Sequence, residues 1–184
     1  MLKPYGDADP SEVAASFERQ IRALAGARVD VLCIETMTDA TEAVLAVRAA
    51  RAVAPGVPIV ATMTFERTRR GFFTVMGVSI AQAARELAEA GADIVGSNCG
   101  NGIDVMIEIA REFRAQTDRP LAIQSNAGLP ERRGSELVYP ESPEYTAARA
   151  ATLAEMGVSI VGGCCGTTPA HIRAIAAALA GRGS

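Results

Sequence analysis

The sequence predicts an α/β fold of the TIM (β/α)8 type, present as an incomplete barrel of about five parallel βα units. Five short apolar runs alternate with longer amphipathic stretches at a spacing of roughly 30 residues, which indicates parallel strands joined by helices. Each apolar run ends in polar residues, glycine or cysteine. A barrel gathers all such ends around one pocket, whereas a doubly wound sheet concentrates its chemistry at one switch point. A closed barrel of eight units typically takes about 250 residues, and this chain has 184.

The chain opens with a predicted helix over residues 10–24, which precedes the first strand. Its apolar residues, from Val13 to Leu24, recur at helical spacing, and charged residues occupy the other face. Gly26 ends this helix. Residues 29–36 then form an apolar run that is typical of a strand buried on both faces.

The remaining elements follow in strand–helix order. A helix over residues 39–53 leads through a Pro-Gly-Val-Pro turn to a strand over residues 59–65. A polar loop over residues 66–77, with three arginines expected in solvent, separates that strand from a helix over residues 79–90. Strands are then predicted at residues 92–97, 120–125 and 158–161, and helices at residues 103–116, 144–156 and 169–179, with an irregular loop between residues 130 and 143. The first and last strands would have unpaired edges, which invite association.

Composition and charge exclude several classes of protein. Hydrophobic residues make up 49% and charged residues 21%, so we expect one globular domain over residues 1–184. The net charge of −3, without a basic stripe, argues against nucleic acid or an anionic membrane as partner. A signal-peptide pattern and an apolar run of membrane-spanning length are both missing, so we expect a cytoplasmic protein. The 4 cysteines would stay reduced there, which favours metal binding or catalysis over a disulfide framework.

Three of these cysteines follow predicted strand ends. Cys164 and Cys165 lie between glycines in the sequence GGCCGTTP of residues 162–169, and Cys99 lies in the sequence GSNCG of residues 96–100. Zinc held by three protein ligands keeps a fourth position for substrate, and a thiol bound there is deprotonated. Spacing alone leaves two interpretations open: the three thiols bind one zinc ion, or they are merely small loop residues.

These segments resemble motifs of the homocysteine S-methyltransferase family, which includes betaine-homocysteine methyltransferase, and the resemblance covers essentially the whole chain. Residues 162–169 resemble the double-cysteine motif of the family, and residues 96–100 resemble its single-cysteine motif. The sequence ETMTD of residues 35–39 resembles the motif whose glutamate contacts the homocysteine amino group. The sequence QSNAGLP of residues 124–130 is most similar to the branch of cobalamin-dependent methionine synthase.

The resemblance implies a zinc-dependent transfer of a methyl group to homocysteine, which forms methionine. Cys99, Cys164 and Cys165 would be the Zn²⁺ ligands, and Glu35 would bind the ammonium group of homocysteine. The methyl group would come from a methyl-corrinoid, with methylcobalamin carried on a separate domain or protein.

The first three strands of the family, with an Asp-Gly motif that helps to form the substrate pocket, have no counterpart in this sequence. The alternative is therefore a catalytically incomplete zinc-binding fragment, or an interaction module that completes the barrel of a partner. A homo-oligomer or a separate N-terminal barrel half could supply the missing part. A third interpretation is a thiol-redox protein that uses Cys164 and Cys165, which metal analysis would distinguish.

Other polar and reactive residues receive weaker assignments. Asn126 and Thr64 lie at predicted strand ends and are candidates for substrate binding. His171, the only histidine, is expected at the surface, and Cys33 is expected in the core as a small side chain. Asp93 is expected to cap the start of its strand at the bottom of the barrel.

Overall fold

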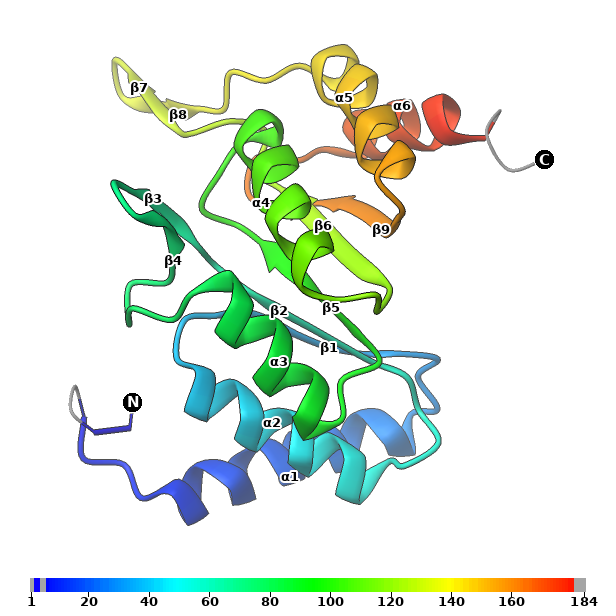
Figure 1. Cartoon of the computed structure of the whole chain (residues 1–184). Helices are drawn as coiled ribbons and strands as arrows, with labels where there is room; N and C mark the ends of the chain where they lie inside the picture. Colours follow the sequence, from blue (N-terminus) through cyan, green and yellow to red (C-terminus); the bar gives the residue numbers. More distant parts are fainter. Residues whose placement is uncertain (1, 4–5, 181–184) are drawn as a thin grey trace.

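The structure, a computed structural model, describes residues 2–3 and 6–180. These residues form six helices, a five-stranded parallel sheet and two short antiparallel hairpins (Figure 1). The helices are α1 Pro10–Gly26, α2 Ala40–Val53, α3 Ile80–Ala90, α4 Ile103–Gln116, α5 Pro143–Glu155 and α6 Pro169–Leu179. The strands of the sheet are β1 Leu32–Met37, β2 Ile59–Met63, β5 Ile94–Asn98, β6 Leu121–Ser125 and β9 Val158–Gly163. The hairpins pair β3 Glu66–Thr68 with β4 Gly71–Phe73, and β7 Glu131–Arg133 with β8 Glu136–Val138.

The order of the strands identifies the sheet as part of a barrel. The strands lie in the order β1-β2-β5-β6-β9, and every neighbouring pair is parallel. This order follows the chain without the reversal that defines a doubly wound sheet. Each helix packs against the next helix along the chain, so the helices follow one another around the sheet in Figure 1. The predicted incomplete barrel is confirmed.

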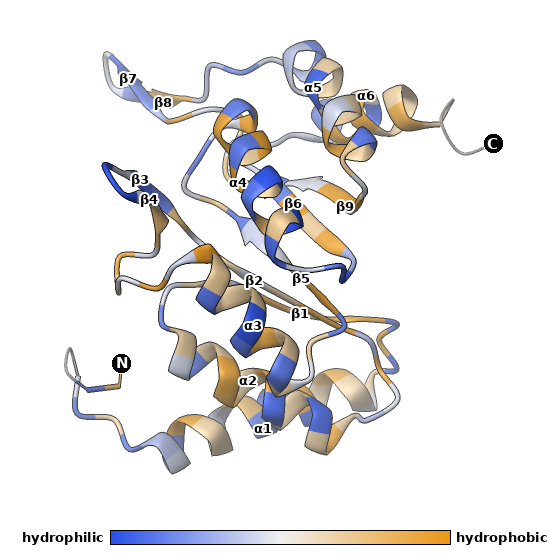
Figure 2. Ribbon diagram, viewed as in Figure 1, coloured by the Kyte–Doolittle hydropathy of each residue, from blue (hydrophilic) through white to orange (hydrophobic). Residues whose placement is uncertain are grey.

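The hydrophobic core lies between the sheet and the helices. All residues of β2 are buried, and the fully buried rings of Phe65 and Phe113 pack edge to face with their centroids 5.6 Å apart. Figure 2 shows hydrophobic residues along the strands and hydrophilic residues at the hairpin tips. None of the helices in the described part of the chain has the length and apolarity that a membrane crossing requires.

The first strand differs from the prediction of burial on both faces. β1 begins at Leu32, which is buried, but Cys33 and Glu35 are exposed. The reason is topological: β1 is an edge strand of an open sheet, so its inward-facing residues lack opposing strands to cover them. The expectation that Cys33 is a core residue is therefore wrong.

Two segments that the sequence predicts as loops, a polar one over residues 66–77 and an irregular one between residues 130 and 143, contain hairpins. β3 and β4 are joined at Arg69 and Arg70, and Gly71 begins β4 with φ of 111°. Phe72 of this hairpin is buried, and its three arginines are exposed, as expected. Gly134, with φ of 65°, lies in the turn between β7 and β8. Strands of three residues with mixed charge are too short to display the alternation by which a strand is predicted.

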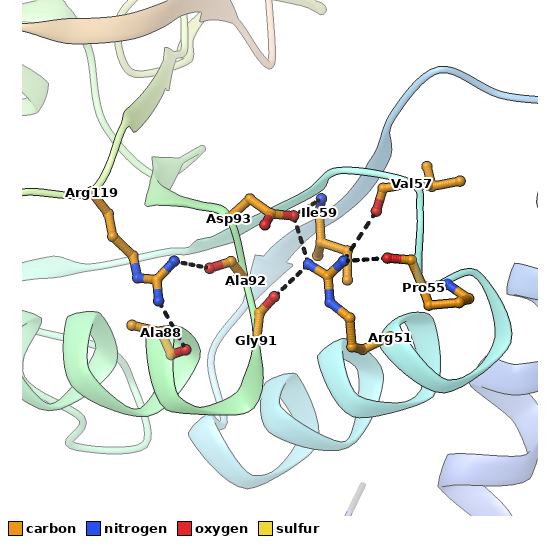
Figure 3. A network of polar contacts seen from close by, with 9 residues as sticks. All are labelled: Arg51, Pro55, Val57, Ile59, Ala88, Gly91, Ala92, Asp93 and Arg119. Carbon is orange, nitrogen blue, oxygen red and sulfur yellow. Dashed lines mark hydrogen bonds and ion pairs between the residues drawn. The ribbon is translucent and has the colours of Figure 1, made fainter.

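An ion pair between Arg51 and Asp93 joins α2 to the amino-terminal ends of β2 and β5 (Figure 3). One guanidinium nitrogen of Arg51, Nη2, donates to the carbonyl of Gly91 and to Oδ2 of Asp93, both at 2.6 Å. The same carboxylate oxygen accepts the N–H of Ile59 at 2.8 Å. Burial alone would raise the pKa of Asp93, but the hydrogen bonds from Ile59 and Arg51 hold that pKa below its usual value. Asp93 thus lies at the start of its strand, as expected.

Candidate metal centre

The three thiols singled out in the sequence meet at one point. The sulfur atoms of Cys99, Cys164 and Cys165 all lie within 4.8 Å of one another, and those of Cys99 and Cys165 are 3.7 Å apart. Tetrahedral zinc with Zn–S bonds of about 2.3 Å holds its sulfur ligands about 3.8 Å apart. The spacing of the thiols therefore fits a shared zinc ion.

Both cysteine turns are anchored to the end of β6, which lies between β5 and β9 in the sheet. The N–H of Cys99 donates to the carbonyl of Gln124 at 3.1 Å, and the N–H of Cys164 donates to the carbonyl of Ser125 at 2.7 Å. The carbonyl of Cys165 accepts the N–H of the second residue after β6 at 2.9 Å. Cys99 has φ of 62°, a left-handed conformation that costs a residue with a side chain on the order of 1–3 kcal/mol. Three backbone hydrogen bonds thus hold the strained Cys99 opposite Cys164 and Cys165.

The electrostatics of the cluster favour a bound cation. Burial, reinforced by the neighbouring sulfurs of Cys99 and Cys165, raises the pKa of Cys164 to about 11. Three thiolates cannot lie this close together without positive charge between them, which either protons or a metal ion must supply. Thiolates are soft ligands, and three of them suit zinc with one open position. Cys165 is exposed, so the cluster can be reached from one side.

The structure places Asn126 and Thr64, the two candidate substrate ligands, against the cysteine loops. Asn126 is buried, and its Oδ1 accepts the N–H of Cys165 at 3.0 Å. The hydroxyl of Thr64 donates to the carbonyl of Asn98 at 3.0 Å, one residue before Cys99. Both side chains therefore support the loops that carry the thiols.

Two residues of the site gave no signal in the sequence analysis, and the first is Tyr139. It follows β8, and its hydroxyl donates a hydrogen bond to Cys165. Burial, followed by the charge of Cys165, raises the pKa of Tyr139. Its ring lies over Gly166, where an added Cβ would come 2.1 Å from the ring. Tyr139 comes from a segment predicted as an irregular loop, so no pattern pointed to it.

Asn98 is the second. It is fully buried, and its side-chain nitrogen lies 3.9 Å from the sulfur of Cys164. Asn98 directly precedes Cys99 in the sequence GSNCG, but neither its burial nor its hydrogen-bond partners can be read from that sequence.

Glu35 is exposed on β1 and lies at the edge of the sheet. Together with Cys33 it lines a hollow between β1 and α1, to which Phe17 and Leu24 of α1 contribute apolar walls. The residue after Glu35, Thr36, has φ of 62°. The exposed carboxylate of Glu35 is accessible to a cationic group, and the strained backbone of Thr36 directly follows it.

His171 is buried, which contradicts the expectation of a surface role. Its Nδ1 accepts the N–H of Thr168 at 3.2 Å and lies 2.8 Å from the hydroxyl of Thr168, which completes a capping box at the start of α6. Its Nε2 donates to the carbonyl of Glu141 at 2.9 Å. Glutamate or glutamine usually occupies this position of the box, and the ring nitrogen of histidine makes the same contact here.

Comparison with known proteins gives a match at the level of the family. The family model described as homocysteine S-methyltransferase matches residues 1–179. The methionine synthases of Mycobacterium tuberculosis and Mycobacterium leprae are 37% and 36% identical to the chain over 156 residues. Each alignment covers 82% of this chain and 13% of the relative, so the chain spans a small part of the curated relatives it matches.

Solved structures agree on the fold. The homocysteine methyltransferase MmuM from Escherichia coli superposes in its apo form with a TM-score of 0.74 at 20% identity, covering 94% of this chain and 58% of that one. Its metallated form also gives a TM-score of 0.74 at 20% identity, covering 94% and 53%. Dihydrodipicolinate synthase from Bacteroides thetaiotaomicron gives 0.59 at 17% identity, covering 91% and 53%.

Proposed function

Since the chain belongs to the homocysteine S-methyltransferase family, we propose that it binds one zinc ion through Cys99, Cys164 and Cys165 and methylates homocysteine to methionine. The observation that carries the proposal is the convergence of the three sulfur atoms within 4.8 Å. A zinc ion with three cysteine ligands has one position left for substrate and lowers the pKa of a thiol bound there.

The residues of the chain keep this arrangement ready for substrate. The anchoring of both cysteine turns to the end of β6 fixes the sulfur positions before substrate arrives. In the reaction the homocysteine sulfur loses its proton and gains the methyl group, and the electron pair of the broken bond stays with the donor. Glu35 binds the ammonium group of the substrate: the resemblance of residues 35–39 to the homocysteine-binding motif supports this role, and the carboxylate is exposed on β1, where it can accept charge-assisted hydrogen bonds from an ammonium group. The contacts of Asn126 and Thr64 favour support of the cysteine loops, and contact with substrate stays a prediction for both.

The methyl donor that we propose is a methyl-corrinoid on a separate domain or protein. The similarity of residues 124–130 to the cobalamin-dependent branch supports this choice, as does the similarity to two methionine synthases. Cys165 is exposed, which leaves a side of the site open to a donor of that size.

A second candidate function is an interaction module that completes the barrel of a partner or of a further segment. β1 and β9 are the edge strands of the described sheet, and both carry residues that a completed barrel would cover. Cys33 is exposed on β1, and Ile160 on β9 is 37% exposed. Unpaired strand edges with apolar neighbours favour association. Activity would then require strands supplied by that partner or segment, whereas zinc binding would not.

Metal analysis of the purified chain tests the proposal. We expect a zinc content of roughly one ion per chain, and loss of that zinc in Cys99→Ala, Cys164→Ala and Cys165→Ala. Cys33→Ser is the matched control, because Cys33 is a free thiol outside the cluster, and it should keep its zinc. Calorimetry on the zinc-loaded chain should then detect homocysteine but not homoserine, which lacks the thiol. Zinc that survives the loss of any cluster cysteine would refute the site. A Cys164–Cys165 disulfide in the absence of bound metal would support the redox interpretation instead.

A further inference from the structure

We infer that Asn98 is a positioning residue whose single buried amide joins the sulfur of Cys164 to the end of the strand that carries Glu35. The inference rests on the proposed function in one of its two tests. The zinc affinity can be compared only if the chain binds zinc, whereas the hydrogen exchange of the Thr36 amide can be measured without metal. The observations that carry it are four hydrogen bonds, the topology of the sheet and a strained backbone at Thr36.

All four hydrogen-bonding positions of the Asn98 amide are used. Oδ1 accepts the backbone N–H of Thr36 and the hydroxyl of Thr62, both at 2.7 Å. Nδ2 donates to the hydroxyl oxygen of Thr36 at 2.8 Å and faces the sulfur of Cys164 at 3.9 Å. The backbone N–H of Thr36 can only donate, so Oδ1 must face it, and the amide cannot be turned around. The –NH₂ group is therefore directed at Cys164, which makes that sulfur an acceptor.

The amide connects β5 not only to its neighbour β2 but also to the ends of β1 and β9, with which β5 forms no strand pair. Asn98 ends β5, Thr62 lies in β2, Thr36 lies near the end of β1, and Cys164 follows β9. β1 and β9 are the two outermost strands of the described sheet. In an open barrel, one side chain thus ties the carboxyl ends of both edge strands to the middle of the sheet.

Thr36 supplies an independent sign of constraint. Its φ of 62° is unusual for a β-branched residue, and such a conformation persists only where the surroundings hold it. Asn98 holds Thr36 at two points, through its backbone N–H and through its hydroxyl. Because Glu35 directly precedes Thr36, the same two bonds fix where the carboxylate is presented.

Loss of the amide should therefore weaken metal binding. Polar groups that hydrogen-bond to metal ligands typically account for a factor of 10–100 in metal affinity. For Asn98→Ala we expect the zinc affinity, measured by competition with a chromophoric chelator, to fall by about 10- to 100-fold. Thr62→Val is the matched control: it removes one hydrogen bond of the same amide at a buried site and leaves the contact with Cys164 intact. Its zinc affinity should stay within about 3-fold of the parent, because no bond to a candidate ligand is lost.

The strand readout needs no metal. In the metal-free chain, hydrogen exchange of the Thr36 amide should accelerate at least about 10-fold in Asn98→Ala relative to neighbouring amides of β1. The Thr62→Val control should change this exchange far less. If Asn98→Ala does not fold, NMR on the parent decides the matter: the Asn98 side-chain amide signals should shift on addition of zinc, and those of Asn101 should shift less. Asn101 is a fair reference because its amide bonds to the carbonyl of Phe65.

The outcomes distinguish a failure of the proposed zinc binding from a failure of the role inferred for Asn98. A parent chain that binds no zinc refutes the proposed function, and the exchange of Thr36 still decides whether Asn98 holds the strand end. Zinc binding that is equal in the parent and in Asn98→Ala refutes the inference and leaves the proposed function standing. Equal losses of affinity in Asn98→Ala and Thr62→Val would also refute it, because general destabilisation would then explain the effect.

Discussion

Zinc binding by this chain should depend steeply on pH. The pKa of Cys164 is raised to about 11 by burial and by the sulfurs of Cys99 and Cys165, so at neutral pH this thiol carries a proton in the metal-free chain. Zinc must displace that proton in order to bind. The apparent zinc affinity should therefore rise with pH by at least about tenfold per unit, or about 100-fold between pH 6.5 and pH 8.5.

Chelator competition at several pH values measures this slope, and calorimetry in two buffers of different ionisation enthalpy counts the protons released. Cys33→Ser should give the same slope as the parent, because Cys33 lies outside the cluster. A zinc affinity that does not change with pH over this range would refute the reasoning, since it would mean that the metal displaces no thiol proton.

Three further substitutions test the role of Glu35, the close approach of β5 to β6 and the ion pair of Asp93. Glu35→Gln should weaken homocysteine binding by about 10- to 100-fold in calorimetry and leave zinc content unchanged, because a charge-assisted hydrogen bond is lost. Equal binding would remove Glu35 from the site. Gly96→Ala should destabilise the chain by about 3 kcal/mol in urea unfolding, because the new Cβ would lie 1.9 Å from the carbonyl oxygen of Ala122 in β6. A stable Gly96→Ala would mean that β5 and β6 can separate at no cost. Arg51→Ala should cost about 1 kcal/mol, since the ion pair with Asp93 is partly exposed. The lowered pKa of Asp93 means that its contribution is present above the unfolded value of 3.8 and is lost as the pH falls through the folded value. Parent and Arg51→Ala should therefore converge in acid unfolding.

The barrel could be predicted because its signals are local. Apolar runs, capping residues and glycines repeat along the chain, and each helix bound follows from them to within two residues. The convergence of the thiols could also be predicted, because the carboxyl ends of parallel strands meet at one end of a barrel. Cys99 and the pair at residues 164–165 each follow such an end.

The errors arise where a residue's environment depends on distant parts of the chain. Cys33 has the sequence context of a core residue, but it lies on an edge strand whose inner face is uncovered. His171 looks like a polar residue in a first helical turn, but its ring is buried between Thr168 and the carbonyl of Glu141. Such burial cannot be seen in the local sequence.

The two residues missed at the site have the same explanation. The role of Asn98 depends on its hydrogen bonds with Thr36 and Thr62, which precede it by 62 and 36 residues. Tyr139 reaches Cys165 only because the segment after β8 folds back over Gly166. Sequence patterns indicate which face of an element is buried, but they do not indicate which distant side chain will be its hydrogen-bond partner.

X-ray absorption at the zinc edge tests the central claim most directly, because it counts the sulfur atoms around the metal. We predict three sulfur ligands at about 2.3 Å in the zinc-loaded chain and four after homocysteine is added. Fewer than three sulfur ligands before substrate, or a sulfur count that homocysteine leaves unchanged, would contradict this claim.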